Sequence, residues 1–160
     1  MTSQDLSDLA RRFRFNERFL AMLTKDLDET DWTARPPAGG NSAAWIVGHL
    51  AHFRRVTLRG LGADVPQAPW EPRVAMGSKP REAEPIAPPA ELMRDFAESG
   101  AKLEARLLAM TPEDAATPTP PLPDGSKTRA ALATFYHFHE TYHLGQLGYL
   151  RRTRGRPGFM

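Results

Sequence analysis

The sequence predicts an all-α protein, a four-helix bundle whose helices are joined by long proline-rich connections. Three observations favour this fold. Apolar side chains recur at helical spacing in four separate segments, whereas no segment shows the convincing alternation of a β-strand. Prolines and glycines gather between these segments, where they end helices. A chain of 160 residues without internal repeats suits a single domain, residues 1–160.

The first predicted helix begins at Ser3 or Asp5, either of which can cap it, and ends near Thr30. Its apolar residues follow helical spacing, and Asn16 lies on the same seam, where we expect a hydrogen-bonded core amide. The apolar row consists of Leu6, Leu9, Phe13, Leu20, Leu23 and Leu27.

The second predicted helix spans residues 43–59. Asn41 or Ser42 caps its start, because short polar side chains accept hydrogen bonds from the first free backbone N–H groups. Gly60 and Gly62 end it, as glycines after a helix commonly do.

Residues 61–87 contain too much proline for a helix or a central strand. A link this long in a compact domain is usually functional or disordered. We expect a crossover loop that runs the length of the domain, folded back over the bundle by Trp70 and Met76.

The third predicted helix begins at Pro88-Pro89, with proline tolerated in its first turn, and is ended by Thr111-Pro112. A second proline-rich link, residues 112–123, leads to the fourth helix. That helix is capped by Ser126 or Thr128 and continues to about Arg152. Four such helices fit a variant of the up-down bundle, in which facing side chains can build a site in the core.

Composition excludes several classes of protein. The chain has no cysteine, so it can form neither disulfides nor a thiolate zinc site, and it has no cysteine nucleophile. Lys and Arg total 21 against 19 Asp and Glu, and the short cluster of Arg151, Arg152, Arg154 and Arg156 is interpreted as stabilising a helix end rather than binding nucleic acid. With neither a signal peptide nor a membrane span, we expect a cytoplasmic protein with a small-molecule substrate.

His139 and His143 are four residues apart, the spacing by which one helix offers two imidazoles to one metal ion. At ~100° per residue both lie within ~20° of the centre of the apolar face. His137 lies ~140° away, which predicts an exposed side chain that is not a ligand.

On the second helix, His49 lies near the middle of the apolar face and His52 lies at its edge, ~95° off. Three inward histidines are costly as bystanders, because each buried imidazole needs polar partners. A metal explains them better, with His49, His139 and His143 as ligands and at least one coordination position open. Imidazole suits several metals, among them zinc, nickel, iron and copper.

Residues 139–143 also spell H-E-x-x-H, the zinc-protease signature in which the glutamate is the general base. Here the 17 residues after His143 contain no His, Asp or Glu to serve as a third ligand. No strand is available to bind a peptide, and Glu140 lies ~80° from the face centre, at the rim of the predicted site. We therefore disfavour a protease.

The sequence resembles the DinB-like (DinB/YfiT-like) family of metalloenzymes. Residues 41–52, N-S-A-A-W-I-V-G-H-L-A-H, resemble that family's second helix. Asp124-Gly125 followed by the H-x-x-x-H-x-G-Q-L element of residues 139–147 resembles its fourth. The resemblance spans nearly the whole chain. It implies an up-down-down-up bundle, a homodimer, and a divalent metal on the three histidines, zinc or nickel first, with iron or manganese as alternatives.

Some relatives in that family are thiol-dependent S-transferases or isomerases. The leading hypothesis is accordingly an enzyme whose metal activates an external low-molecular-weight thiol for transfer to an electrophile. A metal-dependent hydrolase and a non-catalytic metal- or ligand-binding stress protein stay open as alternatives. We expect Gln146 to orient a metal-bound ligand, and Glu140 or His52 to carry protons.

Overall fold

Four long helices form the molecule, which we describe from a computed structural model covering residues 1–37, 39–78 and 86–158. No strand occurs in these ranges, apart from one isolated bridge between Pro118 and Thr128, and the all-α prediction is confirmed. The long helices are α1 (Ser3–Thr24), α3 (Ala43–Gly60), α4 (Pro89–Leu108) and α6 (Arg129–Thr153). The short ones are α2 (Glu29–Thr33), η1 (Glu71–Arg73) and α5 (Pro112–Ala115).

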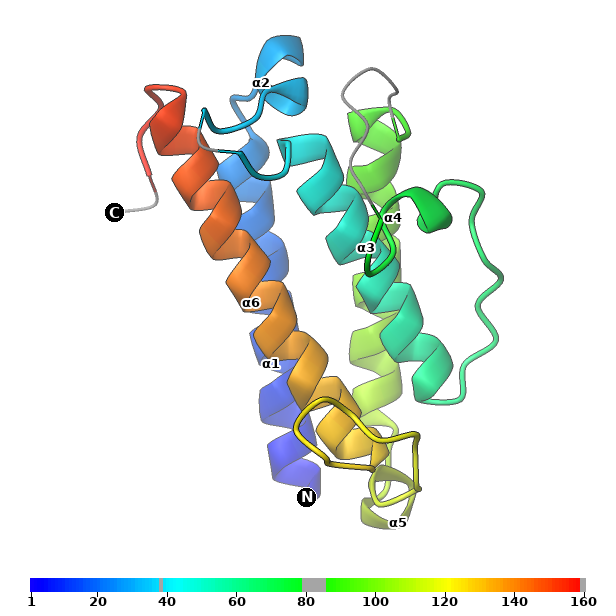
Figure 1. The fold of residues 1–160 in the computed structure, drawn as a ribbon. Helices are drawn as coiled ribbons and strands as arrows, with labels where there is room; N and C mark the ends of the chain where they lie inside the picture. The colour runs from blue at the N-terminus through cyan, green and yellow to red at the C-terminus, as the bar shows by residue number, and fades with distance from the viewer. Residues whose placement is uncertain (38, 79–85, 159–160) are drawn as a thin grey trace.

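The bundle runs up-down-down-up, as Figure 1 shows. Helices α1 and α6 point one way and α3 and α4 the other, and each helix packs against two neighbours. Because the consecutive helices α3 and α4 are parallel, the link between them has to return over the full length of the bundle. This confirms the predicted crossover.

Three of the four long helices, α1, α3 and α6, begin after a polar residue whose side chain caps the helix. Thr2 forms a capping box with Asp5, in which each side chain accepts a hydrogen bond from the other residue's backbone N–H. Ser42 caps α3 and Thr128 caps α6, so each of these caps is one of the two predicted. The cap of α1 is Thr2, so the prediction of Ser3 or Asp5 as the cap is wrong, and Asp5 is instead the second residue of the capping box.

The predicted end of the first helix is wrong. Helix α1 stops at Thr24, and a separate short helix, α2, follows. The physical reason is a second capping box: the Asp28 side chain accepts from the Asp31 backbone N–H, and the Asp31 side chain accepts from the Asp28 backbone N–H. Leu27 still packs against the core, which explains why the apolar spacing continues past the break.

The core has two parts, separated by a polar layer. In this layer Arg54 of α3 donates two hydrogen bonds of 2.9 Å to Glu140 of α6. It also reaches Glu17 and the backbone carbonyls of Phe13 and Phe96, so its bonds extend to α1 and α4 and use all five of its N–H groups. The upper core, nearer α2, is built chiefly from Leu20, Leu23, Trp45, Ile46, Leu50, Leu92, Phe96, Leu144, Leu147 and Leu150. The lower core is built chiefly from Leu6, Leu9, Phe13, Leu58, Leu61, Leu103, Leu107, Met110 and Leu132.

Asn16 belongs to the same polar layer. It is buried and donates a hydrogen bond of 3.1 Å to the Thr141 hydroxyl, as expected for a core amide. The polar layer therefore connects all four long helices at the same height along the bundle. On α6, this height is next to the segment that carries the clustered histidines.

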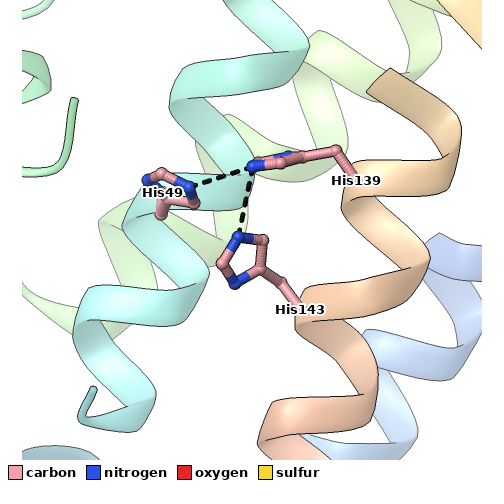
Figure 2. Close-up of side chains that lie close together, drawn as sticks. All are labelled: His49, His139 and His143. Carbon is pink, nitrogen blue, oxygen red and sulfur yellow. Dashed lines mark hydrogen bonds between the residues drawn. The ribbon is translucent and has the colours of Figure 1, made fainter. Parts of the chain in front are cut away.

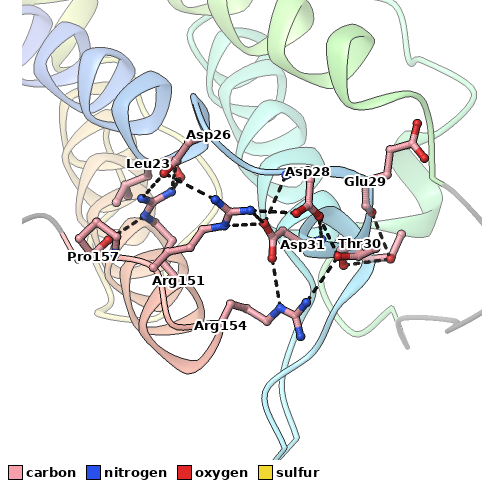
Figure 3. Close-up of polar contacts among 11 residues, drawn as sticks. Leu23, Asp26, Asp28, Glu29, Thr30, Asp31, Arg151, Arg154 and Pro157 are labelled. Atoms are coloured by element: carbon pink, nitrogen blue, oxygen red, sulfur yellow. Dashed lines mark hydrogen bonds and ion pairs between the residues drawn. The ribbon is translucent and has the colours of Figure 1, made fainter.

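The C-terminal arginines pair with acids near the end of α1, as Figure 3 shows. Arg151 binds Asp26 and the Leu23 carbonyl, while Arg154 binds Asp31. Arg156 pairs with the same acids and with Asp28. The interpretation of this cluster as cations at a helix end holds for Arg151, which lies in the last turn of α6 and donates to a carbonyl in the last turn of α1. The arginines in addition join the end of α6 to the segment that runs from the end of α1 into α2.

The described part of the link 61–87 is held against the bundle by buried side chains, among them Trp70 and Val74. Met76, the second predicted anchor, is instead 71% exposed, so only Trp70 is confirmed in that role. Residues 79–85 of this link lie outside the described residues. None of the described helices is both long enough and apolar enough to cross a membrane.

Candidate metal centre

Three histidines from two facing helices meet at one point, as Figure 2 shows. The Nε2 atom of His139 lies 3.2 Å from Nε2 of His49 and 3.1 Å from Nε2 of His143. His49 comes from α3, and the other two come from successive turns of α6. The structure therefore brings together the three residues that the sequence predicts as ligands.

Two of the rings are held by their other nitrogen. Nδ1 of His49 donates to the Val74 carbonyl at 2.5 Å, because a carbonyl can only accept. Nδ1 of His143 lies 2.8 Å from the Gln146 side-chain oxygen. Both rings then carry their proton on Nδ1 and present a lone pair on Nε2, which is the arrangement of metal-binding histidines supported by a second hydrogen bond.

The surroundings keep the three rings neutral. Burial lowers the pKa of His49 to about 4, even though its bond to Val74 acts in the opposite direction. Burial and the neighbouring His143 and His49 lower the pKa of His139 to about 3, and burial also lowers that of His143. Neutral imidazole is the form that binds metals.

A metal ion fits this arrangement. Zinc–nitrogen bonds of ~2.0–2.1 Å place two ligands of a tetrahedron ~3.3 Å apart, close to the observed separations of 3.1 and 3.2 Å. Without a cation, an Nε2–H group on His139 could donate a hydrogen bond to only one of the two Nε2 lone pairs, of His49 and His143, that face it. Nδ1 of His139 is itself buried and has no hydrogen-bond partner among the described residues.

Aromatic rings close one side of the centre. Trp45 stacks on His49 with ring centroids 4.4 Å apart, and Phe53 lies 4.7 Å from His49 and 4.5 Å from His139. Tyr136 packs on Phe53 at 5.0 Å. These rings restrict the movement of the imidazoles and exclude water from that side, which strengthens electrostatic interactions at the centre.

Glu140 is not at the rim of the centre as the sequence predicts. It is buried, and both carboxylate oxygens accept hydrogen bonds from Arg54. The physical reason is that a buried arginine requires an anion, and Glu140 supplies it. The H-E-x-x-H pattern of residues 139–143 therefore places its glutamate in the polar layer, away from the three Nε2 atoms.

His52 is also drawn away from the centre. Its Nδ1 atom lies 2.7 Å from the carboxylate of Glu71, a fully buried residue of η1. His137 is half-buried, with its ring edge-on to Phe13 at 5.2 Å, so the prediction of an exposed side chain is wrong. As expected for a residue that is not a ligand, it is absent from the cluster.

Sequence reasoning missed Arg54, Glu71 and Val74. One signal for Glu71 is present: His52, Arg55 and Arg59 have the i, i+3, i+7 spacing of a single helix face, and two arginines beside a histidine on one partly buried face favour an anion opposite them. Nothing in the sequence marks Val74, because it acts through its backbone carbonyl.

The family model described as the DinB superfamily matches residues 12–147. Among solved structures, the fold is similar to YfiT from Bacillus subtilis, which is described as a probable metal-dependent hydrolase with an unusual four-helix bundle topology. The TM-score is 0.70 at 17% identity, over 98% of this chain and 91% of that one, a likeness that shows the fold. No curated protein matches the chain. The matched segment contains all three clustered histidines, and the chain belongs to the DinB superfamily.

Proposed function

We propose that this protein is a divalent-metal-dependent enzyme in which His49, His139 and His143 hold the ion, with zinc or nickel as the first candidates. One observation carries the proposal: three Nε2 atoms converge while Val74 and Gln146 occupy Nδ1 of two of the rings. A divalent ion on three imidazoles keeps a coordination position open, where it lowers the pKa of a bound thiol or water and so supplies a nucleophile near neutral pH.

The nucleophile that we favour is an external low-molecular-weight thiol, transferred to a small electrophile. The chain has no cysteine of its own, so any thiol must come from outside. Glu140, which follows His139 in the sequence, and Glu71, which is bonded to His52, are both buried and paired with arginines. A reaction that needs no carboxylate base fits these pairings best, since a thiol ionises far more easily than water.

Hydrolysis is the second candidate, favoured by the description of YfiT as a probable metal-dependent hydrolase. In that case the protons would have to move without Glu140, whose two oxygens are occupied by Arg54. His52 is the remaining predicted proton carrier, and its Nδ1 atom is bound to Glu71.

Metal analysis of the purified protein tests the centre. We expect about one divalent ion per chain after metal-replete purification, and a loss of most of it in His49→Ala, His139→Ala and His143→Ala. His137→Ala is the matched control, because it removes a half-buried histidine of the same helix that lies outside the cluster. Equal and low metal content in the wild type and all four variants would contradict the proposal.

Turnover assays then separate the reactions. The metal-loaded protein is given a panel of small electrophiles with and without bacillithiol, mycothiol or glutathione, and activated esters and amides without thiol. Thiol-dependent consumption of an electrophile that is lost in His139→Ala supports the transferase. Thiol-independent cleavage supports the hydrolase, and metal binding without any turnover supports a non-catalytic binding protein.

A further inference from the structure

Glu71 is a buried carboxylate to which neither proposed reaction assigns a role. It is fully buried and accepts hydrogen bonds from three side chains on one face of α3. These are His52 at 2.7 Å, Arg55 at 2.9 Å and Arg59 at 2.6 Å. The Ala68 backbone N–H also donates to it, at 2.7 Å. One side chain thus ties the link after α3 to the middle of α3.

Glu71 is also the first residue of η1, and the residue after this short helix, Val74, contacts the candidate centre. The Val74 N–H donates to the Glu71 carbonyl at 3.1 Å, which closes the turn. The carbonyl of Val74 then accepts the Nδ1 proton of His49. A short and rigid path therefore connects the Glu71 carboxylate to a ring that faces the other two histidines.

Gly48 permits this close approach. A Cβ atom at this position would lie 3.1 Å from Cγ1 of Val74, tighter than ordinary van der Waals contact. Val74 is fully buried and belongs to the upper core, so it has little room to retreat. A glycine immediately before His49 lets the backbone of the link sit close enough for its carbonyl to reach the imidazole.

We infer that Glu71 is a positioning residue for the metal centre: by anchoring η1 to α3, it places the Val74 carbonyl that holds His49 in the Nδ1–H form with Nε2 aimed at His139. The inference rests on the proposed function, and it adds to the centre a residue of the link after α3, outside the helix segments 41–52 and 139–147 that carry the family resemblance. Hydrogen-bond partners of metal-binding histidines typically change metal affinity by ~10- to 100-fold when they are lost.

The first measurement is metal affinity and geometry. Zinc affinity is determined by competition with a chelator, and cobalt(II) absorption reports the coordination. Glu71→Ala is compared with Asp31→Ala, which removes another buried carboxylate that pairs with two arginines but lies at the α2 end of the molecule. We expect ~10- to 100-fold weaker binding and an altered cobalt spectrum in Glu71→Ala, and neither change in Asp31→Ala, even where urea unfolding shows similar losses of stability.

A second variant tests the inference even if Glu71→Ala does not fold. Gly48→Ala displaces Val74 without removing a charge. We therefore expect Gly48→Ala to bind zinc more weakly than the wild type, as Glu71→Ala does. Gly148→Ala is its control, because an added Cβ there lies within 4 Å of no described atom beyond its chain neighbours and the surrounding helix backbone. If folded Glu71→Ala and Gly48→Ala both bind zinc like the wild type, with the same cobalt spectrum, the inference is overturned.

A metal-free readout separates this inference from the proposed function. Long-range ¹H–¹⁵N correlation spectra of the apo-protein identify the protonated nitrogen of each histidine ring. We expect His49 in the Nδ1–H form in the wild type and a shift toward a mixture in Glu71→Ala and Gly48→Ala. A wild type that binds no metal would overturn the proposed function while a shifted tautomer still supports the role of Glu71, and an unchanged tautomer in both variants would overturn that role.

Discussion

Among single residues, the pair of Arg54 and Glu140 has the clearest consequence for stability. Both side chains are buried, and removing one partner leaves the other charge uncompensated. We expect Glu140→Gln to lower the free energy of unfolding by roughly 3–5 kcal/mol in urea titrations, with metal content unchanged. Glu17→Gln removes a partly exposed partner of the same arginine and should cost about 1 kcal/mol or less. A Glu140→Gln protein of wild-type stability but without activity would instead make Glu140 catalytic.

Glu71 makes stability depend on pH in acid. Burial alone would raise its pKa, but hydrogen bonds from Arg59, Ala68, His52 and Arg55 outweigh burial and lower the pKa from 4.5 to about 2. Since the folded pKa is the lower one, this contribution is complete above pH 4.5 and is lost as the pH falls toward 2. It amounts to on the order of 3 kcal/mol.

Urea unfolding of the wild type and Glu71→Gln at a series of pH values measures this effect. The stability difference between the two proteins should be largest near neutral pH and should narrow steadily between pH 4.5 and 2. A difference that stays constant across that range would show that the Glu71 carboxylate titrates alike in the folded and unfolded chains.

The face of a helix on which a side chain lies can be predicted from the sequence, whereas the partner of that side chain cannot. The positions of His139, His143 and His49 follow from helical periodicity, which assigns a face to each side chain. The partner of each side chain does not follow, because it depends on how separate helices are placed. Glu140 was therefore expected at the rim of the site, whereas Arg54 on a different helix draws it into the polar layer.

At the scale of helices, close packing of α4 against α1 and α3 depends on Gly100. A Cβ atom there would overlap the Arg54 guanidinium and the Glu17 carboxylate. We expect Gly100→Ala to destabilise the protein by roughly 1–3 kcal/mol in thermal or urea unfolding, despite the higher helix propensity of alanine. Gly148→Ala, where the added methyl group has open space among the described residues, should instead stabilise the protein by about 1 kcal/mol. Equal effects of the two substitutions would contradict this account of Gly100.

Helix boundaries were predictable only where a local signal decides them. Ser42 and Thr128 cap their helices as short polar side chains do. The end of α1 was missed because the apolar spacing continues to Leu27, while the capping box of Asp28 and Asp31 starts a new helix. The link after α3 was recognised as irregular from its prolines, but its anchoring through Glu71 depends on three side chains of α3 and could not be predicted from the link alone.

Five large apolar or aromatic side chains are exposed on the outer faces of α1 and α6. These two helices are neighbours, and α6 exposes aromatic side chains at the helical spacing of residues 138, 142 and 149. Gly145 lies in the same row, and a Cβ atom there would have open space among the residues that the structure describes. The exposed apolar side chains of the two helices are Phe15, Met22, Phe138, Tyr142 and Tyr149.

We propose that this face joins two copies of the chain, in keeping with the homodimer that the family resemblance implies. A two-fold dimer uses the same patch on both subunits, so one charge placed in the patch is brought near its own copy and repels it. Light scattering after size-exclusion chromatography should give about twice the 17.8 kDa of one chain for the wild type, and about 17.8 kDa for Phe15→Glu combined with Tyr149→Glu. Leu108→Glu is the matched control, because it charges an equally exposed apolar side chain on α4 and should remain dimeric. A wild type that elutes as a monomer at all concentrations would contradict the proposal, as would a double variant that stays dimeric.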